Sequence, residues 1–420
     1  MATWHNILSD SVKRDGNVIE IKRLDRAKAV SDFIRVINEA ISEYKSIIVD
    51  LSDVNGLYPN AVVPVAGILQ YLQNEKAVDI NYVNGRYIAN MNILLPQRFN
   101  GDNRHVMNRV WLFSTSEEVA RIVDAYIEEL QKSAQFYKGI LNAIEWSLNE
   151  VLDNVIQHSK TGFGYVMGQL HSTSKNIAFT IFDCGQGIFN SMRDTEHRPR
   201  TTIDAITLAI QEEVTRDKSI GQGNGLFGLH SIVQQGKGKL VITSGRGSYT
   251  YNNGDVKTYD SLPCISNQTP GTIVDFQLNY ANDMSLDKAL VFRGKQYELI
   301  NIHYEELEDE YGRINFKILE HSEGTGTRDA AIRVKNEILN ILSEEQKPIT
   351  LDFTGVAVIS SSFADELLAK LFLSLGLFQF NNLIKIKGLD VSQQNILQRS
   401  VLQRIIEDVY GQNTNQQEIV

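Results

Sequence analysis

The sequence contains only two cysteines, Cys184 and Cys264, among 420 residues. So few cysteines exclude a disulfide framework. The sequence also lacks a CxxC pair of the kind that binds a structural metal. No apolar run approaches the roughly 18–20 residues that a membrane span needs. The polar, mixed-charge start lacks the pattern of a secretory signal peptide. These absences predict a cytoplasmic protein in a reducing compartment, without a membrane partner.

Positive charge is also in deficit. The chain has 41 basic and 51 acidic residues, a formal net charge of −10. An acidic balance argues against non-specific binding to nucleic acid or to an anionic membrane surface. Hydrophobic residues make up 42% of the chain, which is enough for a core in each third. At about 100–200 residues per domain, the length predicts two to four domains.

Patterns of apolar residues divide the chain into α/β regions. Residues 1–110 alternate strands with helical segments at 27–44 and 61–73, and Pro64 is expected in the first turn of the second. In residues 111–280 a long helical stretch, 116–159, precedes strands such as 164–171 and 176–183. That order is typical of helices packed on one face of a largely antiparallel sheet.

A linker with some helical character is expected at 281–295, followed by a third α/β region at 296–420 whose last residues, 412–420, look disordered. An internal similarity connects the first and third regions. Residues 45–62 align without gaps on 347–364, so that Asp50 falls on Asp352. Both segments read as strand, turn and helix. Either the two regions share a fold or two such motifs coincide.

Four weak signals carry chemistry in the middle region. Glu150 and Asn154 lie one helical turn apart, on a helix whose apolar face is formed by other residues. A carboxylate there can orient or deprotonate a nucleophile, and an amide oxygen can bind Mg²⁺. Taken alone, the pair fits a solvated helix face better.

The second signal is a strand that runs directly into Asp183, followed by Gly185 and Gly187. An aspartate at a strand end can accept a hydrogen bond from an exocyclic amine such as that of adenine, and glycines permit close backbone approach. Taken alone, the same pattern is more often a strand and turn with a capping aspartate.

The third signal is a run of glycines, Gly221, Gly223 and Gly225, leading into an apolar helix, an arrangement that favours phosphate. It is neither a Rossmann fingerprint nor a P-loop, because the flanking residues differ. The fourth is Thr272, which follows Gly271 into a strand. It could donate to phosphate or water, although a β-branched strand residue is the commoner role.

Taken in order, these four elements resemble the GHKL superfamily of histidine-kinase-like ATPases over residues 135–280. The resemblance implies a Bergerat-type two-layer α/β sandwich that binds ATP and Mg²⁺. It implies that Glu150 is the general base and that Asn154 is the magnesium ligand. Asp183 would bind the adenine amine.

For the other positions the resemblance implies supporting roles. Gly185 and Gly187 would shape the adenine pocket, and Thr272 would support it. The three glycines at 221, 223 and 225 would cradle phosphates. Residues 189–220 would form a lid, and its basic residues either reach a γ-phosphate or remain solvated: Arg193, Arg198, Arg200, Arg216 and Lys218.

Other features of the sequence indicate which branch of the GHKL superfamily it resembles. None of the eight histidines is followed by Asp or Glu, which disfavours a histidine kinase. Residues 349–372 resemble STAS domains, which include the anti-sigma-factor antagonists, and more closely a STAS-like domain of bacterial proteins. Ser361 is the best match to the phosphorylated serine of that family, although Ser360 and Phe363 depart from its pattern. A helix N-cap is the simpler interpretation of the serine run.

The sequence therefore predicts an α/β protein with a GHKL domain at 111–280, a STAS-like domain at 296–420 and, from the internal alignment, another STAS-like domain at 1–110. We expect an ATP–Mg²⁺ regulatory switch, in style closest to the anti-sigma serine kinases, with protein partners bound through the STAS-like domains. The sharpest version is a serine kinase acting on its own STAS-like domain or on a partner's. The alternatives are an ATP-hydrolysing clamp that works as a homodimer and a nucleotide-dependent scaffold.

Overall fold

The computed structural model describes residues 11–83, 91–101, 105–212, 224–260, 271–292, 295–296, 304 and 307–417, with backbone alone at 295–296 and 408–417. The chain divides into two compact units. Unit 1 comprises Met1–Glu129 and Asn142–Tyr297. Unit 2 comprises Leu130–Leu141 and Glu298–Val420, so the connection between two helices of the middle region belongs with the C-terminal part of the chain. The fold is mixed α/β throughout, as predicted.

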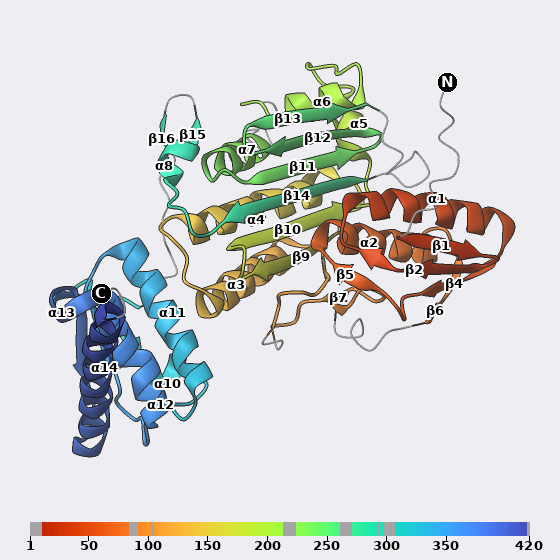
Figure 1. Cartoon of the computed structure of the whole chain (residues 1–420). Coiled ribbons are helices and arrows are strands. Elements are labelled where there is room, and N and C mark those ends of the chain that lie inside the picture. The colour runs from red at the N-terminus through yellow and green to blue at the C-terminus, as the bar shows by residue number, and fades with distance from the viewer. Residues whose placement is uncertain are drawn as a thin grey trace. The chain divides into compact units, whose positions relative to one another are not determined.

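The N-terminal part of unit 1 is a hairpin followed by a β-α-β-α-β unit, with both helices on one side of the sheet (Figure 1). The sheet has the order β1-β2-β4-β6, in which β1 is antiparallel and the other strands are parallel. Two short strands, β3 and β5, pair beside it. The bounds are β1 Val12–Asp15, β2 Val18–Ile21, β3 Arg23–Leu24, α1 Ala27–Glu43, β4 Ser46–Asp50, β5 Asn55–Leu57, α2 Pro59–Asn74 and β6 Asp79–Val83.

Helix α2 begins earlier than predicted. Pro59 takes its first position, where a missing N–H costs nothing, and Pro64 lies inside the helix instead of in its first turn. The helix is apolar on two sides. Its outer side packs on strands of the central sheet, where a Cβ on Gly67 would lie only 2.5 Å from the Phe182 ring. The N-terminal part therefore shares one core with the middle region.

The middle region forms an eight-stranded sheet of order β13-β12-β11-β14-β10-β9-β8-β7. All neighbouring strands are antiparallel except β7 and β8. The predicted strands at 164–171 and 176–183 match β9 and β10 residue for residue. The bounds are β7 Gln97–Arg98, β8 Trp111–Phe113, β9 Gly164–His171, β10 Asn176–Asp183, β11 Lys239–Ser244, β12 Gly247–Asn252, β13 Asp255–Tyr259 and β14 Thr272–Asn279.

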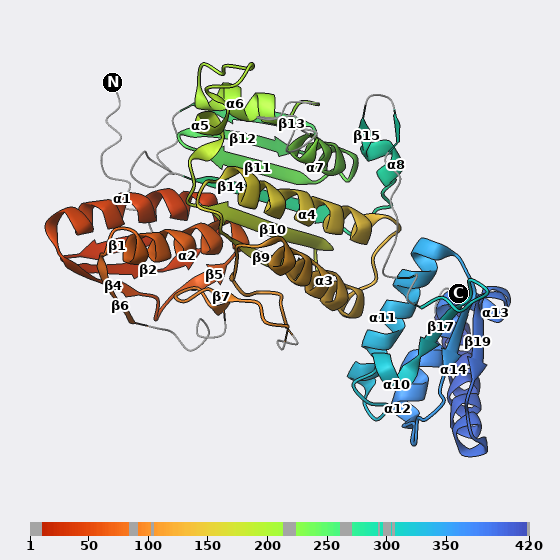
Figure 2. The same ribbon diagram turned by 180° about the vertical axis from the view of Figure 1, so that it is seen from behind.

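Helices cover the face of this sheet opposite to α2, and Figure 2 shows α3, α4 and α7 in front of the strands. On that face Phe179 packs against Tyr126 of α3 and Phe276 of β14. Alternate residues of β10 therefore serve two cores, one with these helices and one with α2. The bounds are α3 Ser116–Ser133, α4 Ile140–His158, α5 Gly187–Met192, α6 Thr202–Ala209, α7 Gly225–Gln235, α8 Leu286–Ala289, β15 Val291–Phe292 and β16 Lys295–Gln296.

The helical stretch predicted at 116–159 is interrupted. Helix α3 ends at Ser133 and α4 begins at Ile140. Gly139 has a φ of +80°, a left-handed conformation that favours glycine and breaks the helix. Side chains from a distant helix accept from and donate to the backbone of this break, as described below. The sequence signal was local and could not anticipate those partners.

The C-terminal part of unit 2 contains a parallel sheet of order β17-β18-β19. The helix that follows β18 has three consecutive parts: the short α-helix α12, a π-helix labelled η2, and α13. Helix α14 extends to Gln417, into the stretch that was expected to be disordered. The bounds are β17 Ile314–Lys317, α10 Ile318–His321, α11 Arg328–Glu345, β18 Ile349–Asp352, α12 Ser361–Ala364, η2 Asp365–Ala369, α13 Lys370–Leu383, β19 Ile384–Lys387 and α14 Val391–Gln417.

The N-terminal and C-terminal parts have the same strand-helix order. The gapless alignment of 45–62 on 347–364 brings the strand end Asp50 onto the strand end Asp352. Each carboxylate accepts a hydrogen bond from the backbone N–H two residues later, at 2.8 Å and 2.9 Å. Each first strand also follows a turn with a left-handed glycine, Gly16 or Gly312. We refer to the two β-α-β-α-β units as the N-terminal and C-terminal repeats.

Candidate functional site

Helix α4 presents its polar row to the start of α7. The predicted apolar face of α4 is buried, which leaves Glu150 and Asn154 partly exposed. A Cβ on Gly225 would lie 2.6 Å from Glu150 Oε2 and 3.2 Å from Asn154 Nδ2. A side chain at position 225 would have to displace the carboxylate of Glu150. The structure therefore brings Glu150, Asn154 and Gly225 together. Burial, followed by the charge of Asp153, raises the pKa of Glu150.

Asp183 lies at the end of β10 and is only 6% exposed. Its Oδ1 accepts from the Gly185 N–H at 2.7 Å, and Thr272 lies opposite it in the β10–β14 register. Burial raises the pKa of Asp183 to about 7, against the backbone hydrogen bonds from Gly185 and Thr272. Because the folded-state pKa is raised, the contribution of this group to stability is greatest below its ordinary pKa and is lost as pH rises through about 7.

The loop after Asp183 is hydrogen-bonded to the end of α4. Gln186 donates from its backbone N–H to the Ser159 carbonyl at 3.0 Å and from its side chain to the His158 carbonyl at 2.8 Å. A Cβ on Gly185 would lie 2.3 Å from the Ser159 carbonyl oxygen, a backbone atom, so glycine is needed at this position. Gly187 has a φ of +76° and begins α5. Helix α4 thus joins the Glu150 row to the Asp183 loop.

Thr272 belongs to a hydroxyl network beside Asp183. Ser244 Oγ lies 3.2 Å from Thr272 Oγ1, accepts from the Ile188 N–H at 2.9 Å and donates to the Gly271 carbonyl at 3.3 Å. The sequence analysis missed Ser244. A single serine at a strand end has no distinguishing local signal, and only the pairing of β11 with β14 brings it opposite Thr272.

Some predicted site residues fall outside the part of the chain that the structure describes. They are Gly221, Gly223, Arg216 and Lys218. Of the described lid residues, Arg193 pairs with Asp194 at 3.6 Å and Arg198 has a φ of +39°. Arg200 precedes the capping box of α6. Cys184 is 4% exposed, and burial raises the pKa of its thiol, as befits a packing residue.

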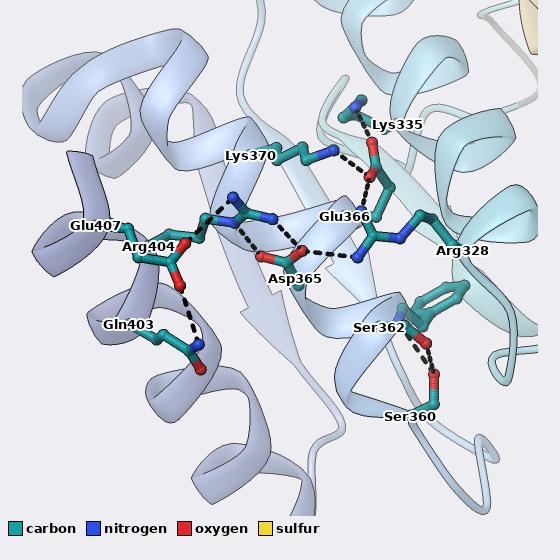
Figure 3. A network of polar contacts seen from close by, with 11 residues as sticks. Arg328, Lys335, Ser360, Ser362, Asp365, Glu366, Lys370, Gln403, Arg404 and Glu407 are labelled. Atoms are coloured by element: carbon teal, nitrogen blue, oxygen red, sulfur yellow. Dashed lines mark hydrogen bonds and ion pairs between the residues drawn. The ribbon is translucent and has the colours of Figure 1, made fainter. Parts of the chain in front are cut away.

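The serine turn of the C-terminal repeat is a helix cap. Ser360 is the N-cap of α12, and its Oγ accepts from the Phe363 N–H at 3.0 Å. Ser360 Oγ also lies 3.1 Å from Ser362 Oγ (Figure 3). The N-cap interpretation is confirmed for Ser360. Ser361 occupies the first helical position and its side chain is exposed.

Next to the serines, two acidic residues of η2 are surrounded by cations (Figure 3). Asp365 is bound by Arg404 of α14 and by Arg328 of α11, at 2.8 Å and 3.3 Å. Arg404 is the main reason that the pKa of Asp365 is lowered. No sequence signal pointed to this network, because its members come from four separate elements.

Glu366 is 2% exposed and is bound by Lys335 at 2.6 Å and also by Lys370 and Arg328. Burial opposes its charge, yet the hydrogen bonds from Lys335 and Lys370 keep the pKa of Glu366 below its ordinary value. The π-helix places the two acidic residues side by side, and π-helical turns are frequent at functional sites.

Comparison with known families identifies one region. Residues 330–394 match a STAS-like domain of unknown function, DUF4325. The match covers nearly all of α11 together with β18, the serine turn and β19, so a C-terminal STAS-like domain is confirmed over residues 330–394. Among curated proteins, none matches the chain. Within the described residues, no helix is both long and apolar enough to cross a membrane.

Proposed function

We propose that the middle region binds Mg–ATP in the manner of the GHKL ATPases and that the chain is a nucleotide-dependent regulatory switch. The observation that carries the proposal is Asp183. A nearly buried carboxylate at a strand end, beside Gly185 and Thr272, is poised to accept a hydrogen bond from an adenine amine. The α4 row at Glu150 and Asn154 supplies the second half of the site.

The described residues fit the nucleotide. Asp183 and its loop would hold the base, while Gly225 brings the backbone at the start of α7 close to Glu150 and Asn154, where phosphate oxygens and Mg²⁺ would bind. The amide oxygen of Asn154 suits Mg²⁺, which would neutralise charge on the phosphates. Glu150 would orient or deprotonate the attacking group. Its raised pKa brings it closer to neutral pH, where a general base is most effective.

The switch role rests on the flanking repeats. STAS-like domains commonly mediate contacts between proteins, and the C-terminal one carries an exposed serine at the start of a helix. A phosphoryl group on Ser361 would sit where the helix dipole and free N–H groups favour negative charge. We therefore propose protein serine kinase activity toward this domain or that of a partner. The shared topology also supports a STAS-like origin for the N-terminal repeat.

Nucleotide binding is tested first. Mg–ATP is titrated into the wild-type chain and into Asp183→Asn. We expect the variant to lose most of its affinity, because a buried acceptor becomes a mixed donor and acceptor. Glu150→Ala should still bind Mg–ATP, whereas Asn154→Ala should lose the magnesium-dependent part. Glu145→Gln on the same helix is the matched control. Unchanged affinity in a folded Asp183→Asn protein would rule out the proposed site.

The reaction is tested with γ-labelled ATP, by following free phosphate and labelled protein in parallel. Label on Ser361 that disappears in Glu150→Ala supports the kinase. Free phosphate without labelled protein identifies an ATP-hydrolysing clamp instead. Binding with neither product identifies a scaffold. For turnover, loss of Glu150 should cost about 10²–10⁴-fold.

A further inference from the structure

One face of α11 carries a row of polar side chains whose partners lie far away in the sequence. Asn336, Asn340 and Glu344 are spaced four residues apart, so they project from the same side of the helix. All three bind backbone groups of residues 131–139, the connection between α3 and α4. This connection and α11 belong to the same unit.

Asn340 is the centre of the row and is only 1% exposed. Its Oδ1 accepts from the Phe136 N–H at 2.7 Å, and its Nδ2 donates to the Gln131 carbonyl at 3.0 Å and to the Ala134 carbonyl at 2.9 Å. The last carbonyls of a helix have no partner within the helix. Asn340 supplies these partners where α3 ends.

Asn336 and Glu344 extend this set of hydrogen bonds to residues on both sides of those bound by Asn340. Asn336 donates to the Lys132 carbonyl at 3.2 Å, and Glu344 Oε1 accepts from the Gly139 N–H at 2.6 Å. The gripped segment therefore runs from the last turn of α3 to the residue immediately before α4. We call these three side chains the α11 grip.

The fold of the repeat does not require the grip. Aligning α1 with α11 by their first residues places Arg35, Glu39 and Glu43 at the positions of Asn336, Asn340 and Glu344. In α1 these three side chains are exposed, and Arg35 pairs with Glu39 on the surface at 3.3 Å. The same helix side is thus solvated in one repeat and committed to the α3–α4 connection in the other.

The gripped segment leads directly into the proposed site. Helix α4 begins at Ile140, one residue after the last gripped amide, and carries Glu150 and Asn154 farther along. At its other end, α11 is joined to η2, the segment that follows the serine turn, because Arg328 and Lys335 bind the acidic pair of η2 (Figure 3). A change of charge or partner at that turn acts on α11 through these ion pairs.

We propose that the α11 grip couples the STAS-like domain to the nucleotide site, with Asn340 as a positioning residue that fixes the start of α4. The inference rests on the proposed nucleotide binding and names how that site is regulated. By linkage, the coupling is reciprocal: what α11 does to nucleotide affinity, bound nucleotide does to the grip.

The test combines hydrogen exchange with nucleotide titration. Asn340→Leu keeps the number and branching of the side-chain heavy atoms and removes all three hydrogen bonds. We expect faster exchange at the Phe136 and Gly139 amides and at least about fivefold weaker Mg–ATP binding, the lower end of typical allosteric coupling. Glu39→Leu, at the equivalent position of the other repeat, should change neither. Glu344→Met, which is less buried, gives the decisive result if Asn340→Leu does not fold.

A reciprocal measurement separates positioning from mere stability. In the wild-type chain, saturating Mg–ATP should slow exchange at the Gly139 amide, whereas a purely structural grip would be unaffected. Faster exchange in the variant with unchanged affinity, or a Gly139 amide indifferent to nucleotide, would overturn the inference and leave the proposed function standing. A wild-type chain that binds no Mg–ATP would refute both, and the first titration shows which case holds.

Discussion

The two repeats share one topology but differ in what the outer sides of their helices contact. The inner sides of their first helices agree, with Ile37 of α1 and Ile338 of α11 both fully buried. Their outer sides differ, because α1 meets solvent where α11 grips residues 131–139. The repeat fold thus needs only the inner side of the helix. The outer side can therefore carry a specific contact, and in the C-terminal repeat it binds residues 131–139.

The second helices differ in the same way. Helix α2 packs its outer side on β9 and β10 through close approach at Gly67. The corresponding helix of the C-terminal repeat begins with serines, contains the acidic pair of η2 and is met by α14 through Arg404. An apolar contact makes the N-terminal repeat a fixed support. In the C-terminal repeat, ion pairs and hydroxyl contacts take the place of this apolar contact.

The largest expected effect tests what the repeats share. Ile37→Ala and Ile338→Ala each remove a fully buried side chain, and each should cost about 2–5 kcal/mol of unfolding free energy. Urea unfolding of the full chain, monitored separately in peptides of each repeat by hydrogen exchange, measures both. A cost below about 1 kcal/mol in either repeat would break the equivalence of the two inner faces.

A second substitution tests the apolar support. Gly67→Ala would ordinarily stabilise a helix, but here the new Cβ would overlap the rings of Phe182 and Tyr165, at 2.5 Å and 2.8 Å. We expect a net loss of about 1–3 kcal/mol, typical of overpacking. Ala369, on which Gly67 falls when the gapless alignment is continued beyond residue 62, already carries a Cβ and is buried. A neutral or stabilising Gly67→Ala would mean that α2 does not need this close approach.

The smallest expected effect concerns the ion pairs of the C-terminal repeat. Asp365→Asn removes the charge that binds Arg404 and should loosen α14 by about 1 kcal/mol, which proteolysis of α14 would detect. Because the pKa of Asp365 is lowered, its stabilising contribution is present above the ordinary value of 3.8 and is lost as pH falls below it. Protection of α14 that is the same at pH 3 and pH 7 would contradict this role.

Local patterns predicted most elements and part of the candidate site. The bounds of β9 and β10 were clear because turn residues flank both strands. Asp183, Gly185 and Thr272 were found together because their types and order are unusual.

The misses share one physical cause, which is dependence on distant partners. The break between α3 and α4 is stabilised by Asn340, about two hundred residues away in the sequence. Ser244 acquires its role only when β11 pairs with β14. The π-helix at Asp365–Ala369 depends on cations from α11, α13 and α14, and no local periodicity reports it.

The account depends most directly on the charge of Asp183. Burial raises the pKa of Asp183 to about 7, so protonation competes near neutrality with the carboxylate form, which is the stronger acceptor for an adenine amine. Mg–ATP affinity is measured by calorimetry at pH 6 and pH 8 in the wild-type chain and in Asp183→Asn, which corrects for titration of the nucleotide itself. We expect wild-type affinity to rise with pH by up to about tenfold more than that of the variant. The same pH dependence and the same affinity in both proteins would contradict the account.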